Sequence, residues 1–229
     1  MKQAEVHGMS QRGGDVQSNL RISDQPIASD LIPSGKCELI ISLEPMEGLR
    51  YLPYLSPEGW LVTNETPFIN IPNYPAEADV RAELDKLPHK IILNVDKVAK
   101  EIGSIRVANI VLLGATTPFL GIDYEKIQTS IREIFERKGE AIVEMNLKAL
   151  AAGKEIAEKL MVDIDDVKAA LDVEESSRIE LQDGYTLILV DIPAIEIRHD
   201  QRTYTTIPLG IILTQDIIVT VCTEDTPVL

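Results

Sequence analysis

"CELIISLEPMEGLRYLPYL", residues 37–55, is the stretch that decides the fold of this chain. Its first part, residues 37–43, is a nearly continuous apolar run, which predicts a strand covered on both faces in a parallel sheet. A short helix is expected to follow within 45–55, because Pro45 suits the first helical position. A strand that passes directly into a helix is typical of an α/β layered domain.

Strand and helix patterns continue on both sides of this stretch. Before it, Lys2 to His7 predicts a strand, and two alternating runs around Pro26, at 15–23 and 26–32, predict a hairpin or adjacent extended segments. The expected elements after it are a strand at 59–65, a proline-punctuated loop at 66–75, a short acidic helix near 76–87 and a strand at 90–96.

The pattern then becomes helical. Apolar residues from Tyr124 to Phe135 recur at helical spacing after Asp123, a good N-cap, and Gly139 separates this helix from one running to about Lys159. Residues 162–172 predict one further capped helix. The last expected elements are three strands rich in β-branched residues, at 185–193, 204–213 and 216–222.

Charge is unevenly distributed along the chain. The net charge of −15 argues against a general nucleic-acid surface, because phosphate binding needs clustered Lys and Arg. Residues 1–160 carry 18 Lys and Arg against 23 Asp and Glu, whereas 161–229 carry 4 against 14. The shorter segment is therefore twice as negative, which predicts a domain boundary near residue 160; the alternative is a drift of surface charge within one domain.

The chain shows no signal for secretion or for a membrane span. Its longest nearly apolar run, residues 109–122, is too short to cross a bilayer and is interrupted by Pro118. The N-terminus lacks the regions of a signal peptide. Cys37 and Cys222 are far apart and match no disulfide framework, so a cytoplasmic protein is expected.

The glycine-rich loop at 8–14 is the best candidate for chemistry. Consecutive glycines let backbone N–H groups turn toward an anion, and an adjacent arginine adds a charged fork, so the loop suits a phosphate or carboxylate. The alternative is a bend joining two strands, with the arginine paired to a neighbouring carboxylate. The candidate residues are Ser10, Gln11, Arg12, Gly13 and Gly14.

Polar residues also follow two of the predicted parallel strands. Glu44 comes after the first, and Asn64 and Thr66 end the second, so all three fall at the edge where α/β sheets bind ligands. The alternative for each is a cap of the following turn. The acidic residues Asp163, Asp165 and Asp166 lack the spacing of a calcium loop and are interpreted as a helix start.

Several kinds of site have no signature in this sequence. No GxGxxG loop follows a first strand, as a dinucleotide-binding domain would require. No nucleophile signature occurs, and neither cysteine lies in a CxxC, so an iron–sulfur cluster cannot be built from this chain alone. No metal site is predicted on this chain.

Long phrases in residues 2–159 resemble a known enzyme family. They are "KQAEVHGMSQRGGDVQSNLRIS", "LIISLEPMEGLRYLPYLSPEGWLVTNETPFINIPNYP", "NIVLLGATTPFLGI" and "ERKGEAIVEMNLKAL". They resemble the beta subunit of indolepyruvate ferredoxin oxidoreductases, which corresponds to the gamma domain of the 2-oxoacid:ferredoxin oxidoreductases. The resemblance implies a Rossmann-like α/β domain with a mostly parallel sheet.

The resemblance also implies a function. The expected role is an accessory subunit of an enzyme that converts an aryl pyruvate and coenzyme A, with oxidised ferredoxin, to an aryl-acetyl-CoA, CO2 and reduced ferredoxin. Thiamine diphosphate and the iron–sulfur clusters belong to the larger catalytic partner subunit in that family, so no cofactor is expected on this chain. The family's opening strand, glycine-rich loop and helix have no counterpart here, which implies a truncated first domain at 1–160.

The remaining residues resemble a different family. "AALDVEESSRIE", "LILVDIP", "YTTIPLGIIL" and "VTVCTEDTPVL", within 164–229, are similar to the N-terminal cytoplasmic domain of CorA-family magnesium transporters. This resemblance implies a small α+β fragment at 161–229. It leaves two alternative functions open: a regulatory fragment of a magnesium transporter, or a non-functional fusion of two gene fragments.

Overall fold

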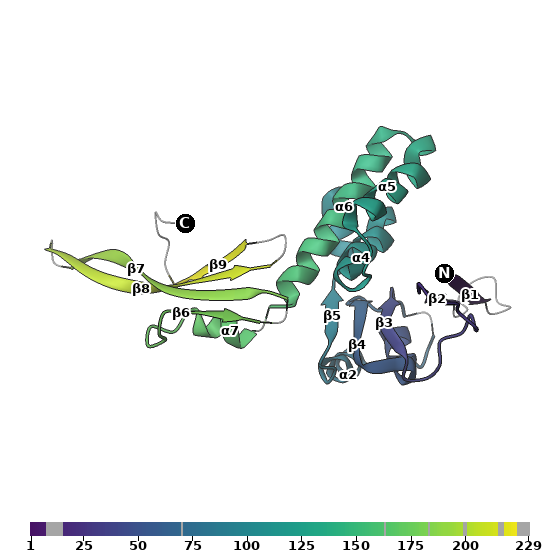
Figure 1. Ribbon diagram of the computed structural model, residues 1–229, viewed down its shortest axis with the longest axis horizontal. Coiled ribbons are helices and arrows are strands. Elements are labelled where there is room, and N and C mark those ends of the chain that lie inside the picture. Colours follow the sequence, from purple (N-terminus) through teal and green to yellow (C-terminus); the bar gives the residue numbers. More distant parts are fainter. Residues whose placement is uncertain are drawn as a thin grey trace. The chain divides into compact units, whose positions relative to one another are not determined.

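The stretch at 37–55 forms a strand, a helix and a tight turn in the computed structural model (Figure 1). Strand β3 is Cys37–Ser42, and helix α1 is Pro45–Arg50 with the proline in its first turn. A 3-10 turn at Leu52–Tyr54 leads into strand β4, Leu55–Asn64. The local prediction from this stretch is therefore confirmed.

The chain divides into two compact units, residues 1–154 and 155–229. The structure describes residues 1–7, 16–69, 71–162, 164–182, 184–198, 201–214 and 218–223. The division falls within helix α6, Glu140–Leu160, whereas the change in charge composition suggested a boundary near residue 160.

A parallel sheet forms the centre of the first unit, in the order β3–β4–β5, where β5 is Lys90–Leu93. Helices α1 and α2, the latter Glu77–Asp85, cover one face of this sheet. Helix α4, Ala108–Thr116, packs against β4. The predicted α/β class with a parallel sheet is confirmed. The buried cluster under α1 and α2 consists of Cys37, Ile40, Leu61, Val80 and Leu84.

Strand β3 differs from its prediction in one respect. Ile40 and Ser42 are buried, but Ile41 and Leu43 are exposed, so the strand is not covered on both faces. Within the described sheet β3 lies at an edge and pairs only with β4, so it has neighbours on one side only. An apolar run predicts a strand, but it does not show whether other elements pack against both faces of that strand.

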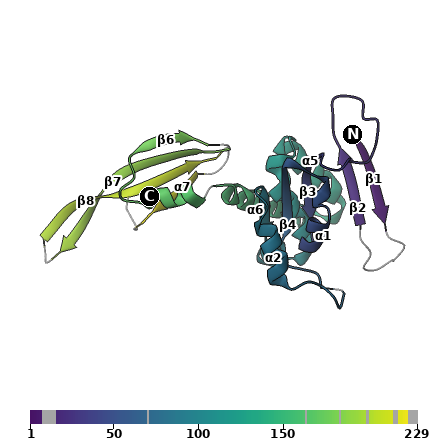
Figure 2. The same cartoon turned by 90° about the horizontal axis from the view of Figure 1, so that it is seen from below.

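The first two strands pair with each other. Strand β1, Lys2–His7, lies antiparallel to β2, Val16–Arg21, as Figure 2 shows. Of the two alternatives for 15–23 and 26–32, the hairpin is wrong, because residues 26–32 form no strand and β2 pairs with β1. Side chains of β2 hold that segment instead: Asn19 Oδ1 accepts from the N–H of Ile32 at 3.3 Å, and Arg21 donates to the carbonyl of Ser29 at 2.8 Å.

The strand predicted at 90–96 is shorter than expected. Strand β5 ends at Leu93, and Asn94 begins helix α3, Val95–Ile102, by accepting from the backbone N–H of Lys97 at 2.9 Å. The run "NVD" was therefore assigned to the wrong element, because an Asn followed by Asp also fits a helix start.

The two predicted later helices are confirmed as α5, Tyr124–Phe135, and α6. Short 3-10 turns at Ile105–Val107, Thr117–Phe119 and Glu136–Lys138 flank α4 and α5. Among the described residues no helix has the length and apolar character needed to cross a membrane. The apolar run 109–122 lies mostly in the buried helix α4.

The second unit is an antiparallel sheet with one short helix. Strands β7 and β8 form a long hairpin, flanked by β6 and β9. The three predicted strands are confirmed, whereas β6 was not predicted, because its "RIEL" is too short to show a clear alternation. In the described residues no strand of this sheet pairs with a strand of the first unit. The bounds are α7 Ile164–Ala169, β6 Arg178–Leu181, β7 Thr186–Arg198, β8 Gln201–Leu213 and β9 Ile218–Cys222.

Helices α4 and α6 cross at two glycines with their backbones in contact. A Cβ atom at Gly114 would lie 2.1 Å from the carbonyl oxygen of Leu150, and one at Gly153 would lie 1.9 Å from that of Val111. Real Cβ atoms do not approach backbone so closely, so only glycine fits both positions. This contact fixes α6 against the first unit.

We expect Gly153→Ala to destabilise the protein by about 1–3 kcal/mol, because the added methyl group forces the helices apart. At a helix position without a neighbouring backbone, a Gly→Ala change stabilises the protein by about 0.5–1 kcal/mol. The sign of the change in stability therefore shows whether the two helices are in contact at Gly153. Urea unfolding measures it, with the exposed Ala151→Ser as a control expected to stay within about 0.5 kcal/mol. A more stable Gly153→Ala variant would contradict the crossing described here.

Candidate functional site

Polar side chains gather at the carboxyl edge of the parallel sheet, where all three strands end. Glu44 follows β3, Asn64 and Glu65 end or follow β4, and Asn94 follows β5. This is the edge at which α/β sheets bind ligands. The structure therefore brings the predicted residues Glu44, Asn64 and Thr66 to one region, together with residues that sequence reasoning missed.

Asn64 is buried and satisfies backbone groups on both sides of the edge. Its Oδ1 accepts from the N–H of Val95 at 3.2 Å, and its Nδ2 donates to the carbonyl of Thr66 at 3.2 Å. The amide thus ties the start of α3 to the loop after β4. Asn64 thus makes structural hydrogen bonds, and Thr66 takes part in them through its backbone carbonyl and not through its side chain.

Glu44 is the N-cap of α1 and holds the far end of the loop at 66–75. Its carboxylate accepts from the N–H of Glu47 at 2.8 Å and from the phenol O–H of Tyr74. Burial raises the pKa of Tyr74 above its ordinary value, and the hydrogen bond and negative charge of Glu44 raise it further. The loop is therefore anchored at both ends, through Asn64 and through Glu44.

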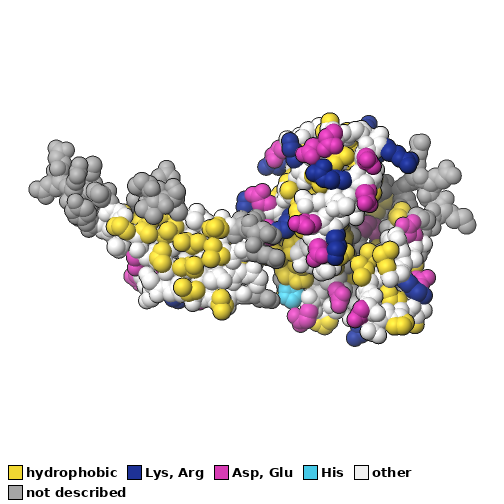
Figure 3. Space-filling model, turned by 45° about the horizontal axis from the view of Figure 1, so that its top comes forward, with side chains coloured by type: hydrophobic (Ala, Val, Ile, Leu, Met, Phe, Trp, Pro, Cys, Tyr) yellow, Lys and Arg dark blue, Asp and Glu magenta, His cyan; other side chains and the backbone are white. Residues whose placement is uncertain are grey.

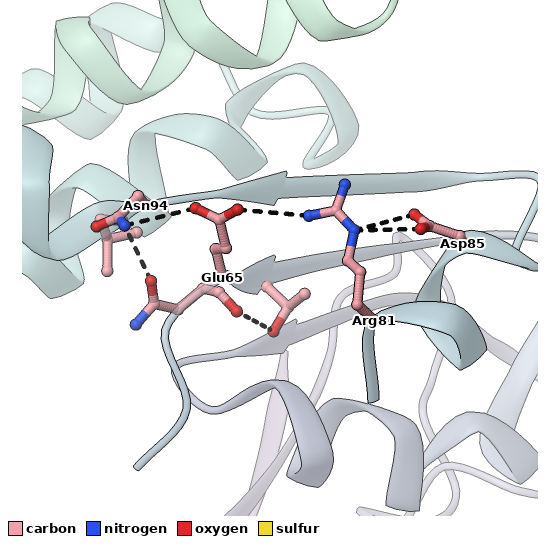
Figure 4. Close-up of polar contacts among 7 residues, drawn as sticks. Glu65, Arg81, Asp85 and Asn94 are labelled. Atoms are coloured by element: carbon pink, nitrogen blue, oxygen red, sulfur yellow. Dashed lines mark hydrogen bonds and ion pairs between the residues drawn. The ribbon is translucent and has the colours of Figure 1, made fainter. Parts of the chain in front are cut away.

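A chain of charged and amide groups crosses the outer side of this edge (Figure 4). Glu65 accepts from Arg81 NH1 at 3.5 Å and from Asn94 Nδ2 at 3.4 Å, and Arg81 Nε donates to Asp85 at 3.1 Å. The three charged side chains are about half exposed, so each ion pair contributes only about 0–1 kcal/mol. Sequence reasoning missed this network because its members belong to different elements, with Arg81 16 and Asn94 29 residues after Glu65.

A pocket of about 310 Å³ lies beside this network. That volume is at the lower end for small-molecule sites. Its lining is mostly apolar, with charge at the rim supplied by Glu65, Glu77 and Arg81. The lining residues are Pro45, Glu65, Pro67, Glu77, Ala78, Val80, Arg81, Leu84 and Ile92. The shape and lining suit an apolar group with one polar end.

The loop after β4 presents apolar side chains to solvent. Phe68, Ile69 and Ile71 are all exposed, the first by 67%. They lie between the anchors at Asn64 and Glu44, in a loop punctuated by prolines. We call these three residues the apolar loop. A group of exposed, bulky apolar side chains is typical of a surface that packs against another protein.

Other candidates have no confirmed place in a site. Ser10, Gln11, Arg12, Gly13 and Gly14 lie outside the described residues, so that prediction remains untested. No three His, Cys, Asp or Glu side chains in the described part of the chain converge as metal ligands. Cys37 is buried, and burial raises the pKa of its thiol. The described residues therefore do not fit an iron–sulfur cluster.

The first unit matches a known enzyme family. Residues 1–156 match the model of the pyruvate ferredoxin/flavodoxin oxidoreductase family, and the chain belongs to that family. The chain is 34% identical over 159 residues to "Indolepyruvate oxidoreductase subunit IorB" of Archaeoglobus fulgidus, covering 66% of this chain and 77% of that protein. The protein of the same name from Pyrococcus horikoshii is 32% identical over 167 residues, 69% of this chain and 81% of that protein.

A solved structure supports the fold. The chain is similar in fold to a 2-oxoglutarate:ferredoxin oxidoreductase from Magnetococcus marinus, with a TM-score of 0.51 and 19% identity. It covers 69% of this chain and only 26% of that chain. The shared fold therefore makes up about a quarter of the longer Magnetococcus marinus chain.

The resemblance of 164–229 to CorA-family transporters finds no support in these comparisons. The family match ends at residue 156, and the relatives described above are named as oxidoreductase subunits. The transporter and the gene-fragment interpretations are therefore set aside.

We expect Tyr74→Phe to lower the free energy of unfolding by about 1–2 kcal/mol, since a hydrogen bond to a charged group is lost. The folded-state pKa of Tyr74 is raised, so its contribution is complete below the ordinary tyrosine pKa of about 10 and disappears as pH rises through the folded value. Urea unfolding of the variant and the parent at pH 8 and at increasing alkaline pH measures both effects.

Tyr54→Phe, at another half-buried tyrosine of the same unit, is the matched control and should change stability by less than about 0.5 kcal/mol. Equal losses in the two variants would show that the bond to Glu44 does not anchor the loop.

Proposed function

We propose that this chain is an accessory subunit of an indolepyruvate-type 2-oxoacid:ferredoxin oxidoreductase. The observation that carries the proposal is the family match over residues 1–156, which spans the first unit, together with relatives named as indolepyruvate oxidoreductase subunits. The reaction is oxidative decarboxylation: an aryl pyruvate and coenzyme A give an aryl-acetyl-CoA and CO2, and the electrons released pass to ferredoxin.

The proposal assigns the cofactors to a larger catalytic partner. Thiamine diphosphate supplies the decarboxylation chemistry, and iron–sulfur clusters carry the electrons. The described residues of this chain offer no converging metal ligands, so its proposed work is to shape or cover the partner's active site. The loop Ser10–Gly14 is proposed to face substrate, coenzyme A or the partner, on its sequence alone.

The apolar loop is the proposed contact with the catalytic subunit. It stands at the carboxyl edge of the sheet, beside the 310 Å³ pocket whose lining includes the adjacent Pro67. Hydrogen bonds at Thr66 and Tyr74 hold the two ends of the loop, which reduces the entropy lost on association. The same fold forms part of a longer chain in the Magnetococcus marinus enzyme, which supports a role inside an assembly.

Reconstitution tests the proposed function. We expect the purified chain alone to show no 2-oxoacid oxidation and no visible absorption, and activity to appear when the catalytic subunit is added under anaerobic conditions. The assay is coenzyme A-dependent reduction of ferredoxin with indolepyruvate, compared with pyruvate. Stoichiometric iron or thiamine diphosphate in the chain alone would contradict the proposal, and a preference for pyruvate would contradict the aryl substrate.

We expect the double variant Phe68→Ser, Ile69→Ser to weaken assembly with the catalytic subunit at least tenfold, because central apolar contacts dominate such interfaces. Its stability should change by less than about 0.5 kcal/mol, since both side chains are exposed. Titration of activity against subunit concentration measures assembly.

Ile134→Ser is the matched control, because Ile134 on α5 is exposed by 67%, as Phe68 is. If this control weakens assembly as much as the loop variant does, the apolar loop is not the contact.

A further inference from the structure

The sheet of the second unit has two faces of different character. Residues opposite each other in an antiparallel pair share a face, so the register sorts the side chains. Helix α7 covers the face that carries Leu187, Leu189 and Ile212, and Gly210 leaves room there for Ala170. Figure 1 shows α7 on one side of the strands.

The opposite face is apolar and partly open. Ile179 and Leu181 of β6 and Ile218 of β9 are exposed, Leu181 by 85%. Between them, on the central strands, Ile188, Ile211 and Leu213 are half-buried. We call these six residues the open sheet face. Figure 3 shows hydrophobic side chains gathered over the strands of this unit.

Farther along the same face, Ile192, Ile207 and Leu209 form a buried cluster. The open sheet face is the part of this face where described aliphatic side chains are most exposed.

The open sheet face carries no charge, although its segment is strongly acidic. Residues 161–229 hold 14 Asp and Glu against 4 Lys and Arg. Where the four strands lie together, the charged residues Arg178, Glu180 and Asp191 are at positions that alternate onto the face of α7. Glu196, Arg198 and Arg202 come farther along the β7–β8 hairpin, beyond the residues that pair with β6 and β9. An uncharged aliphatic area on an acidic unit marks a surface that packs against something apolar.

We propose that the open sheet face packs against the same face of a second copy of this chain. In a twofold dimer the same patch meets itself, so any charge near its centre would oppose a like charge. The open sheet face meets this requirement, and it offers no charged group for recognising an unlike partner. Two sheets packed face to face in this way form a sandwich with interdigitating aliphatic side chains.

The size of the patch limits the surface area that two copies can bury. Four strands about 4.8 Å apart and about five residues long cover roughly 20 by 17 Å. The footprints of two copies add up to roughly 700 Å², less than the roughly 1,000 Å² that a specific, stable interface buries, so the expected dimer is a weak one. It should form toward the upper end of the concentration range tested below. Because both copies are acidic, salt should strengthen it by screening their repulsion.

Sedimentation velocity of the full chain tests the proposal, from about 1 to 200 µM, at low and at high NaCl. The buffer contains a reductant, because Cys222 lies on the same side of the sheet. We expect mass to rise with concentration, and more so at high salt. The double variant Leu181→Ser, Ile218→Ser should shift the midpoint at least tenfold toward the monomer, with unchanged thermal unfolding of the monomer.

Val173→Ser is the control, because Val173 is 72% exposed in the same unit but lies outside the strands. A chain that stays monomeric throughout overturns the proposal and leaves the face to a different occupant. So does a dimer that the double variant leaves intact, that Val173→Ser weakens equally, or that salt weakens. None of these outcomes bears on reconstituted oxidoreductase activity, which rests on the first unit.

Discussion

Helices that follow the strands of the parallel sheet begin with unpaired N–H groups, and these groups have to be satisfied. Glu44 does this for α1, Asn94 for α3, and Asn64 bonds the first residue of α3. Each of these side chains therefore has a structural bond before any ligand is considered. At the carboxyl edge of the sheet, the groups that a ligand could contact are the half-exposed ion pair of Glu65 and Arg81 and the apolar pocket beside it.

The same bonds give the first unit its surface for association. Asn64 and Glu44 hold the two ends of the loop at 66–75, and the exposed apolar side chains Phe68, Ile69 and Ile71 lie between these ends. The side chains that satisfy the helix starts therefore also hold the loop that is proposed to contact the partner. A loop held only by its own backbone would lose more entropy on binding.

The two units meet the need for a buried core in different ways. In the first, two helices cover one face of the sheet and α4 packs on its central strand, with α6 crossing α4 where Gly114 and Gly153 allow backbone contact. In the second, the described structure supplies a single short helix for one face of four strands. The second sheet accordingly leaves Ile179, Leu181 and Ile218 exposed on its strands.

The sequence by itself determined the type of most elements, because periodicity and capping residues act within one segment. The strand and helix at 37–55, the helices on either side of Gly139 and the strands of the long hairpin were all predictable in this way. It also brought Glu44, Asn64 and Thr66 to the correct edge, since parallel strands end on one side.

Only the tertiary structure decided which segments meet. It paired β2 with β1 and not with 26–32, joined Glu65 to Arg81, and left one face of the second sheet partly open. The physical reason is that pairing and coverage depend on contacts between residues distant in the chain, whereas a local pattern records only that a side chain prefers to be buried.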